Sequence, residues 1–212
     1  YEEMTEYIKS KTNNKVLIVP VNKTEWLCTN WSFGWKTILD KVEKIVKELS
    51  NESSTNKVTL IGHSSGGMML RLFLSDLLFN QKIYNGKDLA NCLITLGSPN
   101  QAKRATYLRN FVSSKLPGSY YSSDVCYISV AGELDLNGTI ATNTSLRLSK
   151  QSYRALNGNG DVIGDGLVPR DSALLIGSKH IVIKETAHGK AFGKDWYGSK
   201  NKVEEWLNKS SR

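Results

Sequence analysis

The sequence has few of the residues that build disulfide frameworks, metal centres or membrane spans. Its 212 residues include three cysteines and three histidines. Because the cysteines are odd in number and widely spaced, we expect free thiols, with Cys92 and Cys126 buried in apolar runs. No apolar run approaches the ~20 residues needed to cross a bilayer. We find no metal-ligand cluster, dinucleotide-binding loop or nucleic-acid motif in the sequence, so we expect neither a metal nor a cofactor.

The charge is of one dominant sign but is evenly spread. The formal net charge is +8, yet the lysines between residues 36 and 48 alternate with acidic residues, as on a solvated helix face. We therefore expect no nucleic-acid partner, and attraction to an anionic lipid surface is the minority interpretation. Six Asn-x-Ser/Thr sequons are expected by chance in so asparagine-rich a chain, so they do not indicate secretion.

One stretch carries most of the chemical information. Val58–Ile61 is a short β-branched run that predicts a buried strand, and residues 62–66 read Gly-His-Ser-Ser-Gly, which fits G-x-S-x-G. The apolar residues 68–74 then predict a helix. A strand, a sharp turn and a helix form a nucleophile elbow, in which a strained backbone presents the Ser64 hydroxyl. We expect Gly62 and Gly66 to leave room where a Cβ would collide with the neighbouring turn.

The remaining pattern predicts a single α/β domain over residues 1–212. Further strands are expected at residues 15–20, 92–96, 125–130 and 180–183, and helices at 2–12, 37–49 and 202–209. The loop over residues 21–35 holds three tryptophans, and residues 132–179 are a long connection. Residues 101–123 are expected to form a small lid or a crossover helix. Alternating strands and helices indicate a mostly parallel sheet with helices on both faces.

A serine nucleophile requires a base, and three histidines make elimination practicable. His63 neighbours Ser64 in sequence, but its side chain should leave the turn in another direction. His180 opens a predicted strand and would be fixed in the sheet. His188 follows the last strand in a polar loop, at the edge where parallel sheets collect functional residues. We therefore assign the base to His188.

The acid of a triad should lie between Ser64 and His188 along the chain. Asp135 follows a predicted strand directly. Asp165 sits in Gly-Asp-Gly-Leu-Val-Pro, where glycines permit a tight turn and two apolar residues can anchor it. Because an anchored carboxylate fixes the imidazole tautomer better than a mobile one, we favour Asp165 and keep Asp135 as the alternative. Glu133, Asp161 and Asp171 are weaker candidates.

These motifs resemble the lipase-type α/β-hydrolases, most closely the lipase-like group of plant plastids and cyanobacteria and more distantly the GPI-inositol deacylases. The resemblance rests on Gly-His-Ser-Ser-Gly-Gly at 62–67, Thr-Leu-Gly-Ser-Pro at 95–99, the Gly-Asp-Gly turn, the His188 loop, and Trp-Tyr-Gly-Ser at 196–199. It implies the α/β-hydrolase fold, the triad Ser64–Asp165–His188 and ester hydrolysis. One departure is Asn100, where such lipases often carry histidine.

The resemblance also implies an oxyanion hole with two donors. One is the backbone N–H of Ser65, which follows the nucleophile. The other usually comes from a glycine-rich loop after an earlier strand, and no such loop precedes the elbow. We expect this strand and loop to lie upstream of Tyr1, or else the second donor to come from residues 22–27.

The sequence thus predicts a serine hydrolase acting on a carboxylic ester, lipid or acyl-thioester through an acyl-enzyme. A catalytically inactive hydrolase fold that binds a lipid or a protein is the alternative from another class. An acyltransferase with the same triad is a third interpretation. The oligomeric state and the identity of the substrate leave no signal in the sequence.

Overall fold

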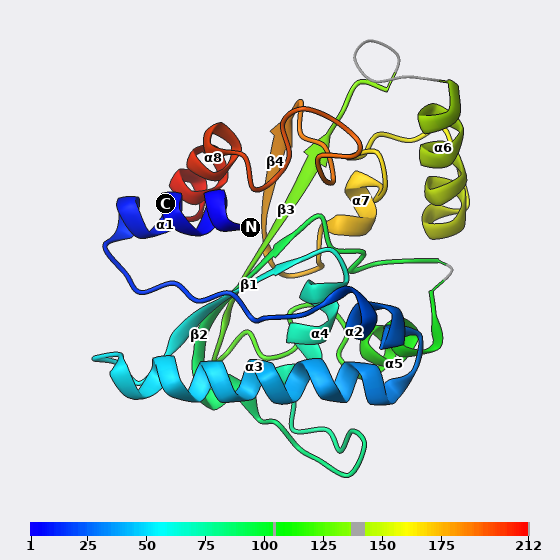
Figure 1. The fold of residues 1–212 in the computed structure, drawn as a ribbon. Helices are drawn as coiled ribbons and strands as arrows, with labels where there is room; N and C mark the ends of the chain where they lie inside the picture. Colours follow the sequence, from blue (N-terminus) through cyan, green and yellow to red (C-terminus); the bar gives the residue numbers. More distant parts are fainter. Residues whose placement is uncertain (104, 137–142, 212) are drawn as a thin grey trace.

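The computed structural model describes residues 1–103, 105–136 and 143–211, and these form an α/β structure around one four-stranded sheet (Figure 1). Each pair of neighbouring strands is parallel, and the spatial order β1-β2-β3-β4 follows the order along the chain. The strands are β1 (Val58–His63), β2 (Ala90–Leu96), β3 (Cys126–Glu133) and β4 (Lys179–Lys184). Their carboxyl ends therefore meet at one edge of the sheet.

Helices cover both faces of this sheet. The α-helices of the described ranges are α1 (Glu2–Thr12), α2 (Lys23–Leu27), α3 (Ser32–Glu52), α4 (Ser65–Phe73), α5 (Tyr107–Lys115), α6 (Asn143–Asn157), α7 (Arg170–Ala173) and α8 (Lys200–Ser210). Figure 1 shows α1 and α8 on one side of the sheet and α3, α4 and α5 on the other. None of them, within those ranges, combines the length and apolar composition that crossing a membrane requires.

Alternation along the strands divides the core into two parts. Leu60 and Leu93 pack with residues of α3 and α4 in one cluster of buried side chains. Ile94 and Ile128 point to the opposite face and pack with residues of α1 and α8, including the fully buried Trp206. Both faces of the two central strands are thereby buried, which explains the nearly continuous apolar sequences of β2 and β3, whereas the edge strand β4 alternates between exposed and buried residues.

The prediction of a strand at residues 15–20 is wrong. This segment is extended but forms no strand within the described structure, and Leu17 and Ile18 are 37% and 43% exposed. Val16 packs with the α1–α8 cluster, whereas Val19 packs with the α3–α4 cluster. The segment therefore crosses the edge of β1 from one face of the sheet to the other, and a chain running across an edge does not build a ladder with it.

The connection predicted over residues 132–179 contains two helices that the sequence analysis missed. Helix α6 has a readable periodicity, because Ser149, Tyr153 and Leu156 are its buried positions. Polar residues between them obscured it. Helix α7 has only one turn, below the length at which periodicity is informative. The other predicted elements are present, with α3 extended at both ends and α5 as the crossover between β2 and β3.

The cysteines are free, as predicted, but one prediction of burial is wrong. Cys126 is exposed because β3 begins there, at the amino edge of the sheet. Cys92 faces it in the neighbouring strand and is partly buried. Burial raises the pKa of the Cys92 thiol to about 12. That thiol is therefore protonated at neutral pH and is a weak nucleophile.

Candidate active site

The turn between β1 and α4 holds Ser64 in a strained backbone conformation. Its φ and ψ are 55° and −131°, a region that residues with a Cβ rarely adopt. The turn is fixed on both sides, since the Ser64 N–H donates to the Leu96 carbonyl at 2.9 Å and its carbonyl accepts from the Gly67 N–H at 3.1 Å. Strain of this kind persists where the surroundings over-determine it, and it aims the Ser64 hydroxyl away from the sheet.

Two glycines leave room for this turn, but they are not the two expected. A Cβ on Gly62 would lie 2.6 Å from the Cα of Gly67, so the strand and helix could not approach as they do. A Cβ on Gly67 would lie 2.2 Å from Ser98 Oγ. Around Gly66, in contrast, a Cβ would meet nothing within 4 Å. The expectation for Gly66 is wrong, because its missing side chain faces open space beside Ser64.

The structure brings together the three residues expected to form a triad. Ser64 Oγ lies 3.0 Å from Nε2 of His188, and Nδ1 of His188 lies 2.9 Å from Oδ2 of Asp165. An ionised carboxylate can only accept, so Nδ1 carries the proton and donates to Asp165. Nε2 is then the acceptor for the Ser64 hydroxyl. This orientation is the one that general-base activation of a serine needs.

Asp165 is held by hydrogen bonds to both of its carboxylate oxygens. Oδ1 accepts from the backbone N–H groups of Leu167 at 3.0 Å and Val168 at 2.7 Å. The Gly-Asp-Gly turn supplies this geometry, with Gly166 at a φ of 96°. The Asp165 carbonyl in turn accepts from the His188 N–H at 2.7 Å, so the two loops are bound together. The fully buried carboxylate has little freedom to rotate away from the imidazole.

Tyr197 contacts the same carboxylate and was missed by the sequence analysis. Its hydroxyl donates to Oδ2 of Asp165 at 2.9 Å and accepts from the Gly132 N–H at 2.6 Å. The side chain is fully buried. Burial and the nearby Asp165 charge raise the pKa of Tyr197 well above its ordinary value, so the hydroxyl remains a donor. The only signal in the sequence was its place in the Trp-Tyr-Gly-Ser stretch.

His63 contacts Tyr1 and His188 through its two ring nitrogens. Its Nε2 donates to the His188 carbonyl at 2.8 Å, and its Nδ1 accepts from the Tyr1 hydroxyl at 2.7 Å. Burial, reinforced by the neighbouring His188, lowers the pKa of His63 from 6.5 to about 4. The ring is therefore neutral near pH 7. Its expected role in packing and hydrogen bonding agrees with these contacts.

The amino end of α4 directly follows Ser64, which is its N-cap residue. Ser65 is the first residue of α4, where a helix leaves its N–H groups without intrahelical acceptors and carries partial positive charge. The Ser65 hydroxyl accepts from Nη2 of Arg109 in α5 at 2.8 Å. Residues 22–27 contain α2, whose Glu25 and Trp26 N–H groups bind Asn22 of the same turn. These two groups are thus occupied within α2.

The remaining predicted residues lie outside this arrangement. Asp135 is exposed, beyond the end of β3, and Asp165 rather than Asp135 contacts the imidazole. His180 binds the Leu175 carbonyl at 2.8 Å. Asn100 is buried, and its amide donates to Thr95 Oγ1 at 3.1 Å and to the Ala173 carbonyl at 2.8 Å. It therefore joins the loop after β2 to α7.

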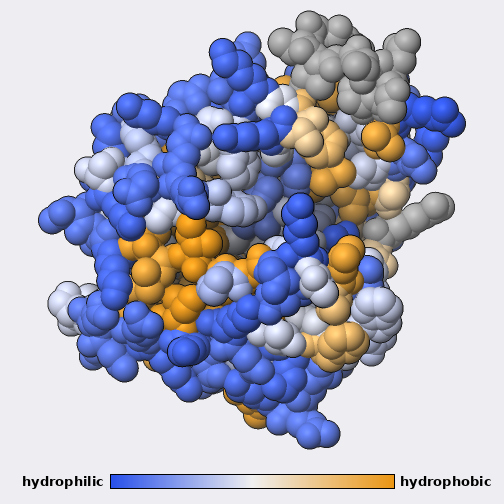
Figure 2. Space-filling view, in the orientation of Figure 1, coloured by the Kyte–Doolittle hydropathy of each residue, from blue (hydrophilic) through white to orange (hydrophobic). Residues whose placement is uncertain are grey.

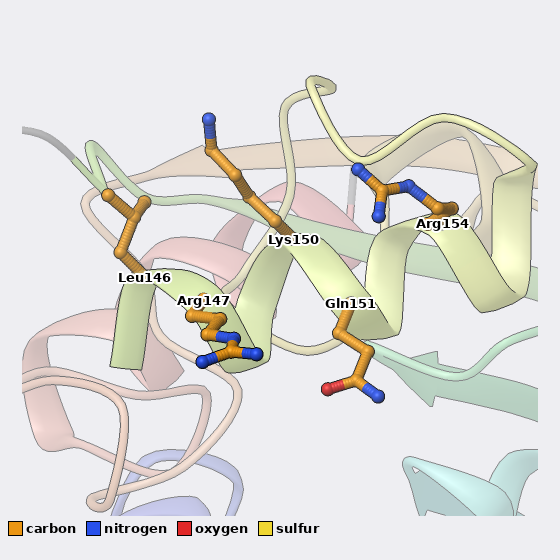
Figure 3. Close-up of a pocket in the computed structure, with 5 residues that line it drawn as sticks. All are labelled: Leu146, Arg147, Lys150, Gln151 and Arg154. Carbon is orange, nitrogen blue, oxygen red and sulfur yellow. The ribbon is translucent and has the colours of Figure 1, made fainter. Parts of the chain in front are cut away.

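Two hollows in the surface differ in their relation to the triad. One, of about 520 Å³, lies along α6 and is lined by Leu146, Arg147, Lys150, Gln151 and Arg154 (Figure 3). The other, of about 420 Å³, is lined by Tyr1, Glu2, Glu3, Ile18, Lys190 and Trp196. Two residues that line the second hollow, Tyr1 and Trp196, pack their rings against His63, whose ring centroid lies 4.7 Å from that of His188. In the described part of the chain, no cluster of three or more potential metal ligands occurs.

Comparison with known proteins adds no assignment to this geometry. The sequence matches no family model. It also matches none of the curated proteins. What can be inferred about function therefore comes from the residues and their arrangement.

Proposed function

We propose that the protein is a serine hydrolase of the α/β-hydrolase type that cleaves carboxylic esters, a class that includes lipids and acyl-thioesters. The observation that carries the proposal is the chain of contacts from Ser64 through His188 to Asp165, at 3.0 and 2.9 Å. It is reinforced by the strained Ser64 backbone at the end of a parallel strand. The resemblance to the lipase-like group is consistent with the same chemistry.

The reaction follows from the hydrogen-bond directions. His188 Nε2 takes the proton of the Ser64 hydroxyl as Oγ attacks the ester carbonyl carbon. Asp165 stabilises the imidazolium that forms, and the Ser65 N–H stabilises the oxyanion. His188 then gives the proton to the leaving alcohol, and an acyl-Ser64 ester remains. Water, deprotonated by His188, hydrolyses that ester and frees Ser64.

Covalent labelling tests the proposal directly. A fluorophosphonate reacts only with an activated serine, so the wild-type protein should be labelled at Ser64 and should hydrolyse 4-nitrophenyl esters. Ser64→Ala should lose both activities while its circular dichroism stays unchanged, because removing one hydroxyl barely perturbs packing. A folded wild-type protein that is not labelled would instead support the inactive binding module.

The acid is tested by a matched pair of substitutions. Asp165→Asn should lower kcat by about 10⁴, because two backbone N–H groups hold the amide oxygen at the Oδ1 position, so that the amide NH₂ faces Nδ1, donates to it and selects the wrong tautomer. Asp135→Asn removes the same charge at an exposed position and should have little effect. Reversed effects in steady-state kinetics would overturn the assignment of Asp165.

A further inference from the structure

Arg109 is a cation beside the proposed nucleophile, and in the part of the chain that the structure describes no acidic residue pairs with it. Its Nη2 donates to the neutral hydroxyl of Ser65 at 2.8 Å, and the side chain is partly buried. Figure 1 shows α5, which carries Arg109, beside α4, which carries Ser65. Among the described residues no carboxylate forms an ion pair with it. Burial lowers the pKa of Arg109, without any opposing acid. Even so, the guanidinium remains charged at neutral pH.

Two other arginines, in contrast, have acceptors for several of their guanidinium N–H groups. Arg170 pairs with Glu133 at 2.8 Å and with Asp171 at 3.0 Å. Arg71 is buried, but the carbonyls of Asn100 and Leu116 accept from its guanidinium. A guanidinium has five N–H donors, and within the described residues Arg109 uses one of them, on a neutral acceptor. A partly desolvated cation with unused donors is the typical partner of a carboxylate or phosphate.

The position of Arg109 indicates where a bound carboxylate or phosphate would lie. Ser65, which it contacts, directly follows Ser64, and the space beside Gly66 in the same turn is open. An anionic group bound by Arg109 would therefore lie within a few bonds of an ester carbonyl held at Ser64 Oγ. The partial positive charge at the amino end of α4 also favours a negatively charged group at this position.

We propose that the substrate is an ester with an anionic group, a carboxylate or phosphate, close to the scissile bond, and that Arg109 binds that group. This inference rests on the proposed function. It narrows the substrate class from esters in general to charged esters. It also gives α5 a role in substrate recognition beyond that of a crossover between two strands.

The test compares charged and neutral esters that are otherwise alike. One pair carries the charge in the acyl part: the mono-4-nitrophenyl ester of adipic acid and its methyl ester. The other carries it in the alcohol part: 4-acetoxybenzoate and its methyl ester. For at least one pair, the wild-type protein should show a kcat/KM at least about tenfold higher for the charged member, the factor expected from one charge-assisted bond.

Arg109→Gln should abolish this preference, and Arg109→Lys should keep part of it. Arg147→Gln removes the same charge from the exposed face of α6 (Figure 3) and should leave the preference intact, which excludes a general effect of net charge. Because the readout is a ratio of two rates, partial loss of folded enzyme cancels. The inference would be overturned if Arg109→Gln lowered kcat/KM equally for the charged and the neutral ester. It would also be overturned if the wild-type preference for the charged ester were below twofold in both pairs. Failure of fluorophosphonate labelling would instead refute the proposed function.

Discussion

Buried polar side chains at the triad are paired in ways that set their protonation. His63 is the clearest case, because its two ring nitrogens bind the His188 carbonyl and the Tyr1 hydroxyl in one tautomer. Because the His188 carbonyl can only accept, Nε2 carries the proton and Nδ1 is the acceptor for the Tyr1 hydroxyl. The ring is thus neutral near pH 7, and it supports His188 through a hydrogen bond to the His188 backbone carbonyl.

This arrangement predicts a loss of stability in acid. The pKa of His63 falls from 6.5 to about 4 on folding, so the unfolded chain takes up the proton first as the pH drops. The stability contributed by the neutral ring is complete above pH 6.5 and is lost as the pH falls towards 4, by about 3 kcal/mol in total. Urea unfolding of wild-type protein and His63→Gln should give a difference in free energy of unfolding that shifts in favour of the variant between pH 7 and pH 4. Parallel pH curves would contradict it.

At the same scale, sequence reasoning located Ser64, Asp165 and His188 because each sits in a recognisable local pattern. Arg109 has no such pattern, and Tyr197 has only its place in the Trp-Tyr-Gly-Ser stretch. Each reaches the site through the fold, Tyr197 from the loop before α8 and Arg109 from α5. A tyrosine or arginine in an ordinary amphipathic setting gives no sign of such a contact until the packing is known.

Among the secondary structure elements, the approach of β1 to α4 depends on glycine at one position of the G-x-S-x-G motif and not at the other. A Cβ on Gly62 meets the backbone of Gly67, which can move only if α4 moves. Gly66 is helical and faces open space. The motif therefore contains one glycine that close packing requires, Gly62, and one that could carry a side chain, Gly66.

Gly62→Ala should destabilise the protein by about 1–3 kcal/mol, the usual cost of overpacking, and should misplace Ser64. Gly66→Ala should be neutral or stabilising by up to about 1 kcal/mol, because alanine restricts the unfolded chain and suits a helix. Thermal unfolding of the two variants measures the contrast. Equal destabilisation would mean that Gly66 also has a close neighbour.

The elements that were predicted correctly have apolar periodicity that matches their burial. Residues 15–20 are as apolar as the true strands, but the αL conformation of Asn13 and the route across β1 direct them elsewhere. An apolar composition indicates that a segment contacts the core. It does not report whether the segment lies along a strand or across it, since that depends on the direction of the chain on both sides.

At the scale of the whole molecule, the face seen in Figure 2 carries an apolar surface region near the β1 edge of the sheet. Figure 2 shows a hollowed apolar patch on the side where residues 15–20 cross the sheet. Leu17 and Ile18 are exposed there, and β1 is paired on one side only within the described structure. Exposed apolar side chains beside an unpaired strand edge favour association between molecules.

We therefore expect the 212-residue chain to self-associate at high concentration. Ile18→Lys should reduce this association, because a charge on the patch opposes its burial. Ile176→Lys is the matched control, since Ile176 is 66% exposed but precedes β4, at the other edge of the sheet. Light scattering over a concentration series measures both. A monomeric wild-type chain, or equal effects of the two variants, would contradict the expectation.

The distance along the chain between the members of the triad has a consequence for timing. Ser64 and His188 are 124 residues apart, whereas Asp165 and His188 are 23 apart. While the chain is being synthesised, the elbow leaves the ribosome long before its base does. On the mechanism proposed above, the serine stays unreactive on the nascent chain and becomes nucleophilic only when β4 and the loop after it dock onto β3. Reactivity at Ser64 thus marks the completion of the last long-range contacts of the sheet.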